Sequence, residues 1–197
     1  MNVLQLPVTP GVRSVRMLVL SYGSVLTPFL GGPSQRINRL GTRWAMRVSM
    51  PPMPAETARH WIEALSRGCE DGVSMPIPQD IAIGDPGAPL VSSAIASGMT
   101  LPIKGLTPSY AVKAGQFLSI VHGGRRYVHI FSADAAANGS GVLSAAIWPM
   151  IRTGLSVNDV IEIVQPRIEG WLDANFEWDV LTMPWVQLPD FTISEAA

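Results

Sequence analysis

Short runs of β-branched and aromatic residues recur along this chain and predict a largely β fold. Three such runs follow one another at residues 117–121, 127–131 and 142–148. Gly123-Gly124 separates the first two, and glycine accepts positive φ without steric cost, so a tight hairpin is expected there. The Asn-Gly-Ser-Gly stretch at 138–141 separates the second and third runs. The pattern therefore predicts an antiparallel β meander.

Strict alternation marks a further strand at residues 43–50. Trp44, Met46 and Val48 fall on one side of it, and Arg43, Arg47 and Ser49 fall on the other, which predicts one buried face. Shorter apolar or alternating runs predict additional strands at 15–20, 77–83, 99–103, 160–164, 176–181 and 191–193.

One segment, residues 54–67, has the periodicity of a helix. Ala58, Trp61, Ile62 and Leu65 repeat at i, i+3, i+4 and i+7 and give a single apolar face. Pro54 suits the first turn of a helix, and Gly68 is expected to be the residue that ends it. A lone helix of this length needs its apolar face packed on a sheet.

The order of these elements predicts a mostly-β (α+β) fold, an antiparallel β-sandwich or barrel with one flanking helix. We expect residues 1–84 and 166–197 to form a ring-forming β core that includes the helix 54–67. Residues 85–165 would form a smaller β-meander unit inserted between them.

Composition suggests that copies of the chain cover one another. Of 197 residues, 47% are hydrophobic and only 15% are charged, against about 25% charged residues in typical soluble domains. Either the surface is rich in Ser, Thr, Gly and Pro, or much of it faces partner subunits. We favour partner subunits and expect a homo-oligomer.

Charge is distributed unevenly, although the net charge of −1 gives no reason to expect nucleic-acid binding. Six arginines and no acid lie between Arg13 and Arg47, whereas eight carboxylates and one arginine lie between Ser156 and Glu195. The two ends could pair within one chain or between copies. The contact residues expected between copies are Arg36, Arg39, Arg43, Arg125 and Arg126 on one side and Asp173, Glu177 and Asp179 on the other.

Groups able to carry out catalysis are sparse, so we expect no enzyme, no metal and no cofactor. Cys69 is the single cysteine, and the three histidines have no nearby carboxylate or cysteine set. Glu177 and Asp179 have a spacing that a hydrolase could use, but any polar strand face gives the same spacing.

Two further expectations concern ligands and location. Trp185 or Trp171 could stack on a sugar, so a carbohydrate-binding β module is an alternative function. No apolar run is long enough for a membrane span, and no signal peptide is recognisable. Because Cys69 has no second cysteine to pair with, an internal disulfide is excluded, and we expect a reducing compartment.

Several short motifs resemble those of a known family. They are the Arg-Trp strand that ends in Pro-Pro-Met (43–53), the helix with a central Trp61, Asp-Pro-Gly (85–87), Lys-Ala-Gly-Gln (113–116), Gly-Gly-Arg-Arg-Tyr (123–127) and Ile-Trp-Pro-Met-Ile-Arg (147–152). In this order they resemble the tail structural proteins of long-tailed bacteriophages, most closely those that form the ring at the distal end of the tail tube.

The resemblance implies a subunit of a hexameric ring that joins the tail tube to the baseplate hub. It also implies a place in the virion tail, assembled in the host cytoplasm, with tube and hub proteins as partners. Another tail protein, such as a tube or terminator subunit, is the alternative. Many members carry an extra domain that resembles carbohydrate-binding modules, and this chain looks too short for a large one.

Overall fold

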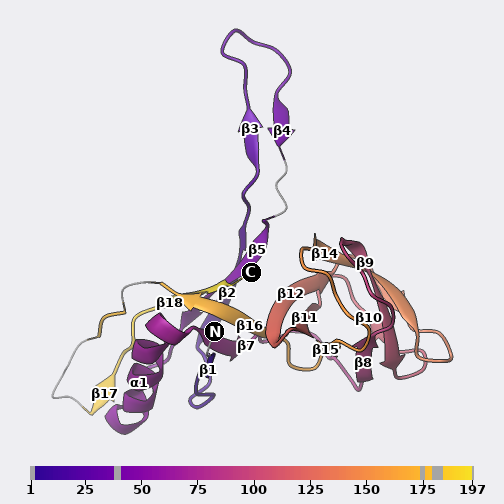
Figure 1. Ribbon diagram of the computed structural model, residues 1–197. Helices are drawn as coiled ribbons and strands as arrows, with labels where there is room; N and C mark the ends of the chain where they lie inside the picture. Colours follow the sequence, from indigo (N-terminus) through magenta and orange to yellow (C-terminus); the bar gives the residue numbers. More distant parts are fainter. Residues whose placement is uncertain (1–2, 38–40, 174–175, 179–183, 197) are drawn as a thin grey trace.

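The computed structural model describes residues 3–37, 41–173, 176–178 and 184–196. The described chain is mostly β and contains one α-helix, which confirms the predicted fold class. It forms a six-stranded sheet covered by the helix, a closed six-stranded barrel, and a two-stranded arm that stands away from both (Figure 1).

The six-stranded sheet has the order β1-β7-β16-β18-β5-β2, in which β1 and β7 pair in parallel and the other pairs are antiparallel. On β5, Met46 and Val48 are fully buried and Arg47 is exposed, as the alternation predicts. The strands are β1 (Leu4–Gln5), β2 (Ser14–Leu20), β5 (Arg43–Ser49), β7 (Val73–Pro76), β16 (Arg167–Leu172) and β18 (Phe191–Glu195).

Helix α1 (Ala55–Asp71) ends about one turn later than predicted, so the expected end at Gly68 is wrong. Gly68 lies inside the helix, where an added Cβ would collide with Val73 and Leu172. Its role is close packing of the helix on the sheet. The residue that ends the helix is Gly72, which has φ +78° and donates its backbone N–H to the Gly68 carbonyl.

The barrel has its own core. On β14 buried and more exposed residues alternate without a break, which places Leu143, Ala145 and Ile147 inside. Its strands are β8 (Gly87–Val91), β9 (Gly98–Leu106), β11 (Phe117–His122), β12 (Arg125–Phe131), β14 (Leu143–Ile151) and β15 (Val160–Glu162). The sheet strands come from the chain before and after this segment.

The predicted hairpin is confirmed. Strands β11 and β12 are antiparallel with His122 opposite Arg125, so Gly123 and Gly124 form a two-residue turn. Both glycines have positive φ, +57° and +76°, as this class of turn requires. Strand β14 then pairs antiparallel with β12 and completes the meander.

Two predicted strands are wrong. Residues 77–83 form no strand. The nearby strand, β7, ends at Pro76, and the proline-rich segment after it runs as a loop. Of the strand predicted at 176–181, residues 176–178 are not in a strand and 179–181 lie outside the described residues. Two short pairs complete the fold: β10 (Ala111–Val112) with β13 (Ala135–Ala136), and β6 (Met53–Pro54) with β17 (Trp185–Val186).

An aromatic cluster joins the barrel to the sheet. The ring of Trp44 on β5 meets Phe117 on β11 and Trp148 on β14 edge-on, with centroids 5.3 Å apart in each pair. Val128 of β12 is fully buried in the core beneath the helix. The two units therefore share a packed junction.

A buried carboxylate lies at the same junction. Glu195 is 1% exposed, and its carboxylate accepts hydrogen bonds from the backbone N–H of Trp44 (3.1 Å) and of Val128 (2.9 Å). Arg152, the residue immediately after β14, places Nη2 2.9 Å from Oε1 of Glu195, an ion pair without hydrogen-bond alignment. The side chain of Glu195, on the sheet, thus contacts β12 and the residue that follows β14, which both belong to the barrel.

His129 of β12 is buried in its neutral form. Its Nδ1–H donates to the Pro149 carbonyl at 2.8 Å, because a carbonyl can only accept. The pKa of His129 is lowered from 6.5 to about 4, chiefly by burial and also by the charge of Arg152, while the hydrogen bond to Pro149 opposes the shift.

We therefore expect the unfolding free energy to fall as the pH drops from 6.5 to 4. In that window the unfolded chain binds a proton that the folded chain rejects, at a cost of up to about 3 kcal/mol. Urea unfolding at pH 7 and pH 4.5 measures this loss. The His129→Asn variant should lack this component, and exposed His60→Asn should retain it. Equal pH dependence of the wild type and His129→Asn would contradict the assignment.

Candidate assembly surface

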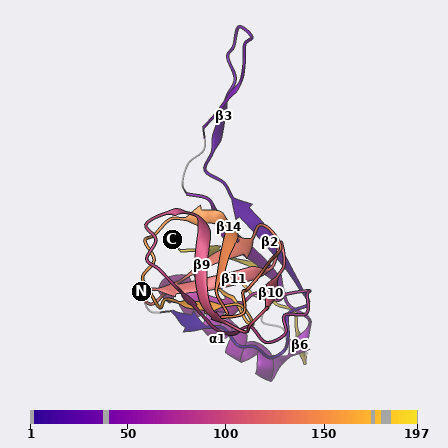
Figure 2. The same ribbon diagram turned by 90° about the vertical axis from the view of Figure 1, so that its right-hand side faces the viewer.

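The arm is the most exposed part of the described chain. Strand β3 (Ser24–Leu26) pairs antiparallel with β4 (Gln35–Ile37), and every residue of both strands is exposed. Figures 1 and 2 show the hairpin projecting away from the sheet and the barrel. An isolated two-stranded hairpin is at best marginally stable in water, so such an arm is typical of a segment that packs against a partner.

The tip of the arm is apolar. Residues 28–31 form a β-turn closed by the Gly31 N–H and the Pro28 carbonyl (3.3 Å), with Phe29 and Leu30 at its two central positions. Their side chains are 100% and 94% exposed. Burying each would stabilise a contact by about 2–3 kcal/mol.

Apolar exposure continues from the tip to the sheet. Strand β2 is one edge of the sheet and leads directly into the arm. Exposed apolar side chains along this path are Leu18, Val19, Tyr22, Val25, Leu26 and Ile37. Apolar exposure of this kind on a chain with few charges is typical of an interaction surface.

The predicted basic residues of the arm have different surroundings. Arg36 is exposed on β4, opposite Val25. Arg43 lies at the root, where its guanidinium sits 5.3 Å from the centre of the Tyr22 ring and Nη1 donates to the Glu195 carbonyl (3.5 Å). Arg39 lies outside the described residues.

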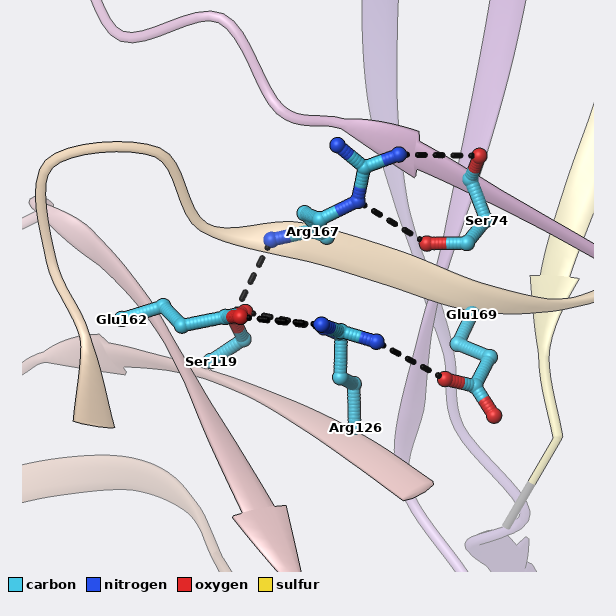
Figure 3. Close-up of polar contacts among 6 residues, drawn as sticks. All are labelled: Ser74, Ser119, Arg126, Glu162, Arg167 and Glu169. Atoms are coloured by element: carbon cyan, nitrogen blue, oxygen red, sulfur yellow. Dashed lines mark hydrogen bonds and ion pairs between the residues drawn. The ribbon is translucent and has the colours of Figure 1, made fainter. Parts of the chain in front are cut away.

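Arg126 pairs within the chain. Its Nε and Nη2 donate to the two carboxylate oxygens of Glu162 at 3.0 Å each, and Nη1 lies 3.5 Å from Glu169 (Figure 3). Since Glu162 belongs to the barrel and Glu169 to the sheet, Arg126 joins the two units. Arg125, beside it at the hairpin, is exposed and makes no ion pair with the described residues.

Two serines extend this contact. The Ser119 hydroxyl of β11 donates to Glu162 (2.6 Å) and accepts from the backbone N–H of Arg167 (3.1 Å). The Arg167 side chain reaches across to β7, where Nε donates to the Ser74 hydroxyl at 3.1 Å (Figure 3). We call Ser74, Ser119, Arg126, Glu162, Arg167 and Glu169 the polar clasp.

The pKa values of three groups in the polar clasp are shifted by their surroundings. The hydrogen bond to Glu162 raises the pKa of Arg126 above its ordinary value. Burial raises the pKa of Glu169, an effect that the nearby Arg126 opposes. Burial, followed by the charge of Arg126, lowers the pKa of Arg167. Removal of Arg126 would therefore leave a buried carboxylate without its counter-charge.

We expect Arg126→Ala to lower the unfolding free energy by about 1–3 kcal/mol. This is less than for a fully buried pair, because Arg126 and Glu162 remain partly exposed. Arg125→Ala is the matched control, and its effect should stay within about 0.5 kcal/mol. Guanidinium unfolding of both variants measures the difference. Equal stabilities would show that the polar clasp contributes nothing.

The predicted acidic contacts lie after β16. Asp173 and Glu177 are exposed and line one small cavity of about 150 Å³ with Asp190, while Asp179 lies outside the described residues. Among the described residues, no ion pair joins Arg36 or Arg125 to Asp173 or Glu177. Contact between these charges in different copies stays a prediction.

The sequence contained one signal for the missed junction residues. Glu195 lies two positions after Ile193 and four after Phe191, so the alternation of β18 places its carboxylate on the buried face. No local pattern in the sequence indicates that Arg152 would pair with Glu195. None indicates that Arg126 would pair with Glu169. These pairs depend on how the barrel meets the sheet.

The described segments hold no group of three or more His, Cys, Asp or Glu able to bind a metal ion. Within the same segments no helix is long and apolar enough to cross a membrane. No family model matches the chain, and no curated protein is significantly similar to it.

Proposed function

We propose that this chain is a structural subunit that assembles with copies of itself. The observation that carries the proposal is the projecting arm with a fully exposed Phe29 at its tip. A solitary chain gains nothing from an apolar hairpin held away from its own core. A subunit gains a contact that reaches onto its neighbour, up to about 30 Å beyond the sheet for the nine residues that follow Leu20 and end at Phe29.

The assembly that we propose is a hexameric ring in the tail of a long-tailed bacteriophage. The resemblance of the motifs at 43–53, 123–127 and 147–152 to distal tail ring proteins supports it. The ring would join the tail tube to the baseplate hub, and the chain would act mechanically, without turnover. The low content of charged residues fits a subunit covered on several sides.

Light scattering of the purified chain over about 1–100 µM tests the proposal. We expect a fixed multiple of 21.2 kDa, and six copies for a hexamer. Filaments of variable mass would indicate a contact that does not close, as in a tube subunit. A single-chain mass across the whole range, alone and with tube and hub proteins, would overturn the proposal.

A carbohydrate-binding module is the second candidate, supported by exposed tryptophans. Trp185 and Trp171 are both about half exposed and could stack on sugar rings. Binding on a glycan array that is lost in Trp185→Ala would favour this function. A ring without glycan binding would exclude it.

A further inference from the structure

An apolar cavity of about 390 Å³ lies on the body of the molecule, far from the arm. The described residues that line it include no charged side chain. The walls come from the loop after β1, helix α1, the loop after β7 and the segment before β16. The apolar residues used below are Val8, Pro10, Trp61, Ile77 and Val164.

The cavity is a built site with a fixed floor. Trp61 is fully buried, and its Nε1–H donates to the Thr9 carbonyl at 3.0 Å, which ties the loop after β1 to the helix. The side-chain amide of Gln79 makes two hydrogen bonds. It donates to the Ile163 carbonyl (2.7 Å) and accepts from the backbone N–H of Phe117 (3.0 Å). The mouth is open, because Val8 and Val164 are exposed. Such a cavity favours an uncharged apolar occupant.

The occupant cannot be the arm of the same chain. Figure 1 shows the arm leaving one side of the sheet and the loop after β1 on the other side. In Figure 2 the arm again points away from the body. Each chain therefore carries an exposed apolar tip and an open apolar cavity that do not meet.

We propose that the tip of the arm, Phe29 and Leu30, inserts into this cavity of a second copy. The tip and the cavity match in chemistry, since residues 25–34 are also without charge. They match in size, since the cavity falls in the range of roughly 300–1,000 Å³ that accepts small apolar groups. The inference deepens the proposed function and rests on it.

This contact uses different surfaces on the two copies. A head-to-tail contact of that kind closes into a ring when the rotation between copies allows it. The side chains of Phe29 and Leu30 would be the central anchors of the interface. The shaft of the arm, strands β3 and β4, would add buried area toward the roughly 800 Å² per partner of a stable interface.

Cysteine cross-linking tests the pairing directly. In a Cys69→Ser background, Phe29→Cys is combined with Val8→Cys or Val164→Cys, which lie on the mouth of the cavity. Under mild oxidation the double variants should form a ladder of covalent oligomers. A mixture of Phe29→Cys and Val8→Cys chains should stop at the dimer, and each single variant alone should give no cross-link.

Charge at the tip or the cavity gives a second measurement. We expect Phe29→Asp and Val8→Asp each to raise the concentration needed for assembly at least about tenfold, and Gln35→Ala, on the arm's shaft, to leave it unchanged. Far-UV circular dichroism should match the wild type, because all three side chains are exposed.

The outcomes separate the two proposals. If the chain assembles normally but no double variant cross-links and Phe29→Asp assembles like the wild type, the pairing is wrong and self-assembly stands. Cross-linking of Phe29→Cys alone would show tip-to-tip contact and also overturn the pairing. If the wild type stays a single chain at every concentration, both proposals fail.

Discussion

Replacement of Glu195 by glutamine is expected to lower the unfolding free energy by about 3–5 kcal/mol. Glutamine keeps the shape of the side chain but removes the charge that balances Arg152, whose side chain is nearly buried. It also turns one acceptor into a donor, so the backbone N–H of either Trp44 or Val128 loses its partner. These losses add at one site.

Urea unfolding followed by circular dichroism at fixed protein concentration measures the effect. Glu63→Gln is the matched control, because Glu63 forms an exposed pair with Arg67 and its loss should cost less than about 0.5 kcal/mol. Adding Arg152→Met to Glu195→Gln should recover part of the stability, since the uncompensated charge is removed. A Glu195→Gln variant within about 0.5 kcal/mol of the wild type would refute the role of the buried pair.

Shortening the arm is expected to convert the assembled protein into single chains. Ser24 and Ile37 are direct partners across the hairpin, so residues 25–36 can be replaced by Asn-Gly, which closes a two-residue turn. The sheet and the barrel keep their contacts, because the removed residues are exposed. The surface that we propose to hold neighbouring copies is lost.

Light scattering and thermal melting of the shortened chain separate assembly from folding. We expect the mass of one chain at concentrations at which the wild type assembles, with a melting temperature within about 4 °C of a wild-type sample diluted to single chains. Gln35→Ala keeps the arm and should keep the wild-type mass. Assembly of the shortened chain to the wild-type mass would show that the arm is dispensable.

The predicted charge contacts need separate tests, because Arg126 pairs within its own chain. Reversing both arginines at the start of β12 would disturb the fold through Arg126, so a loss of assembly could not be assigned to Arg125. Arg125→Glu alone is the informative variant for a contact between copies. Reversing the charge of Arg36 on the arm is informative in the same way, because every residue of β4 is exposed.

Patterns that depend on near neighbours in the sequence determined most of the elements. The alternation around Met46 and Val48 placed β5 with the correct buried face, and Gly123-Gly124 placed the turn between β11 and β12. The apolar face with Trp61 identified the helix. These features follow from side-chain direction and from backbone φ, which are local properties.

Tertiary structure decided what those local patterns leave open. Gly68 reads as a helix end in the sequence, yet the sheet needs its missing Cβ for close packing. Arg126 reads as a surface charge, yet the barrel brings it to Glu162 and Glu169. The exposure of Phe29 and the position of the cavity depend on contacts between distant segments, because burial is a property of the whole fold and not of any one run of residues.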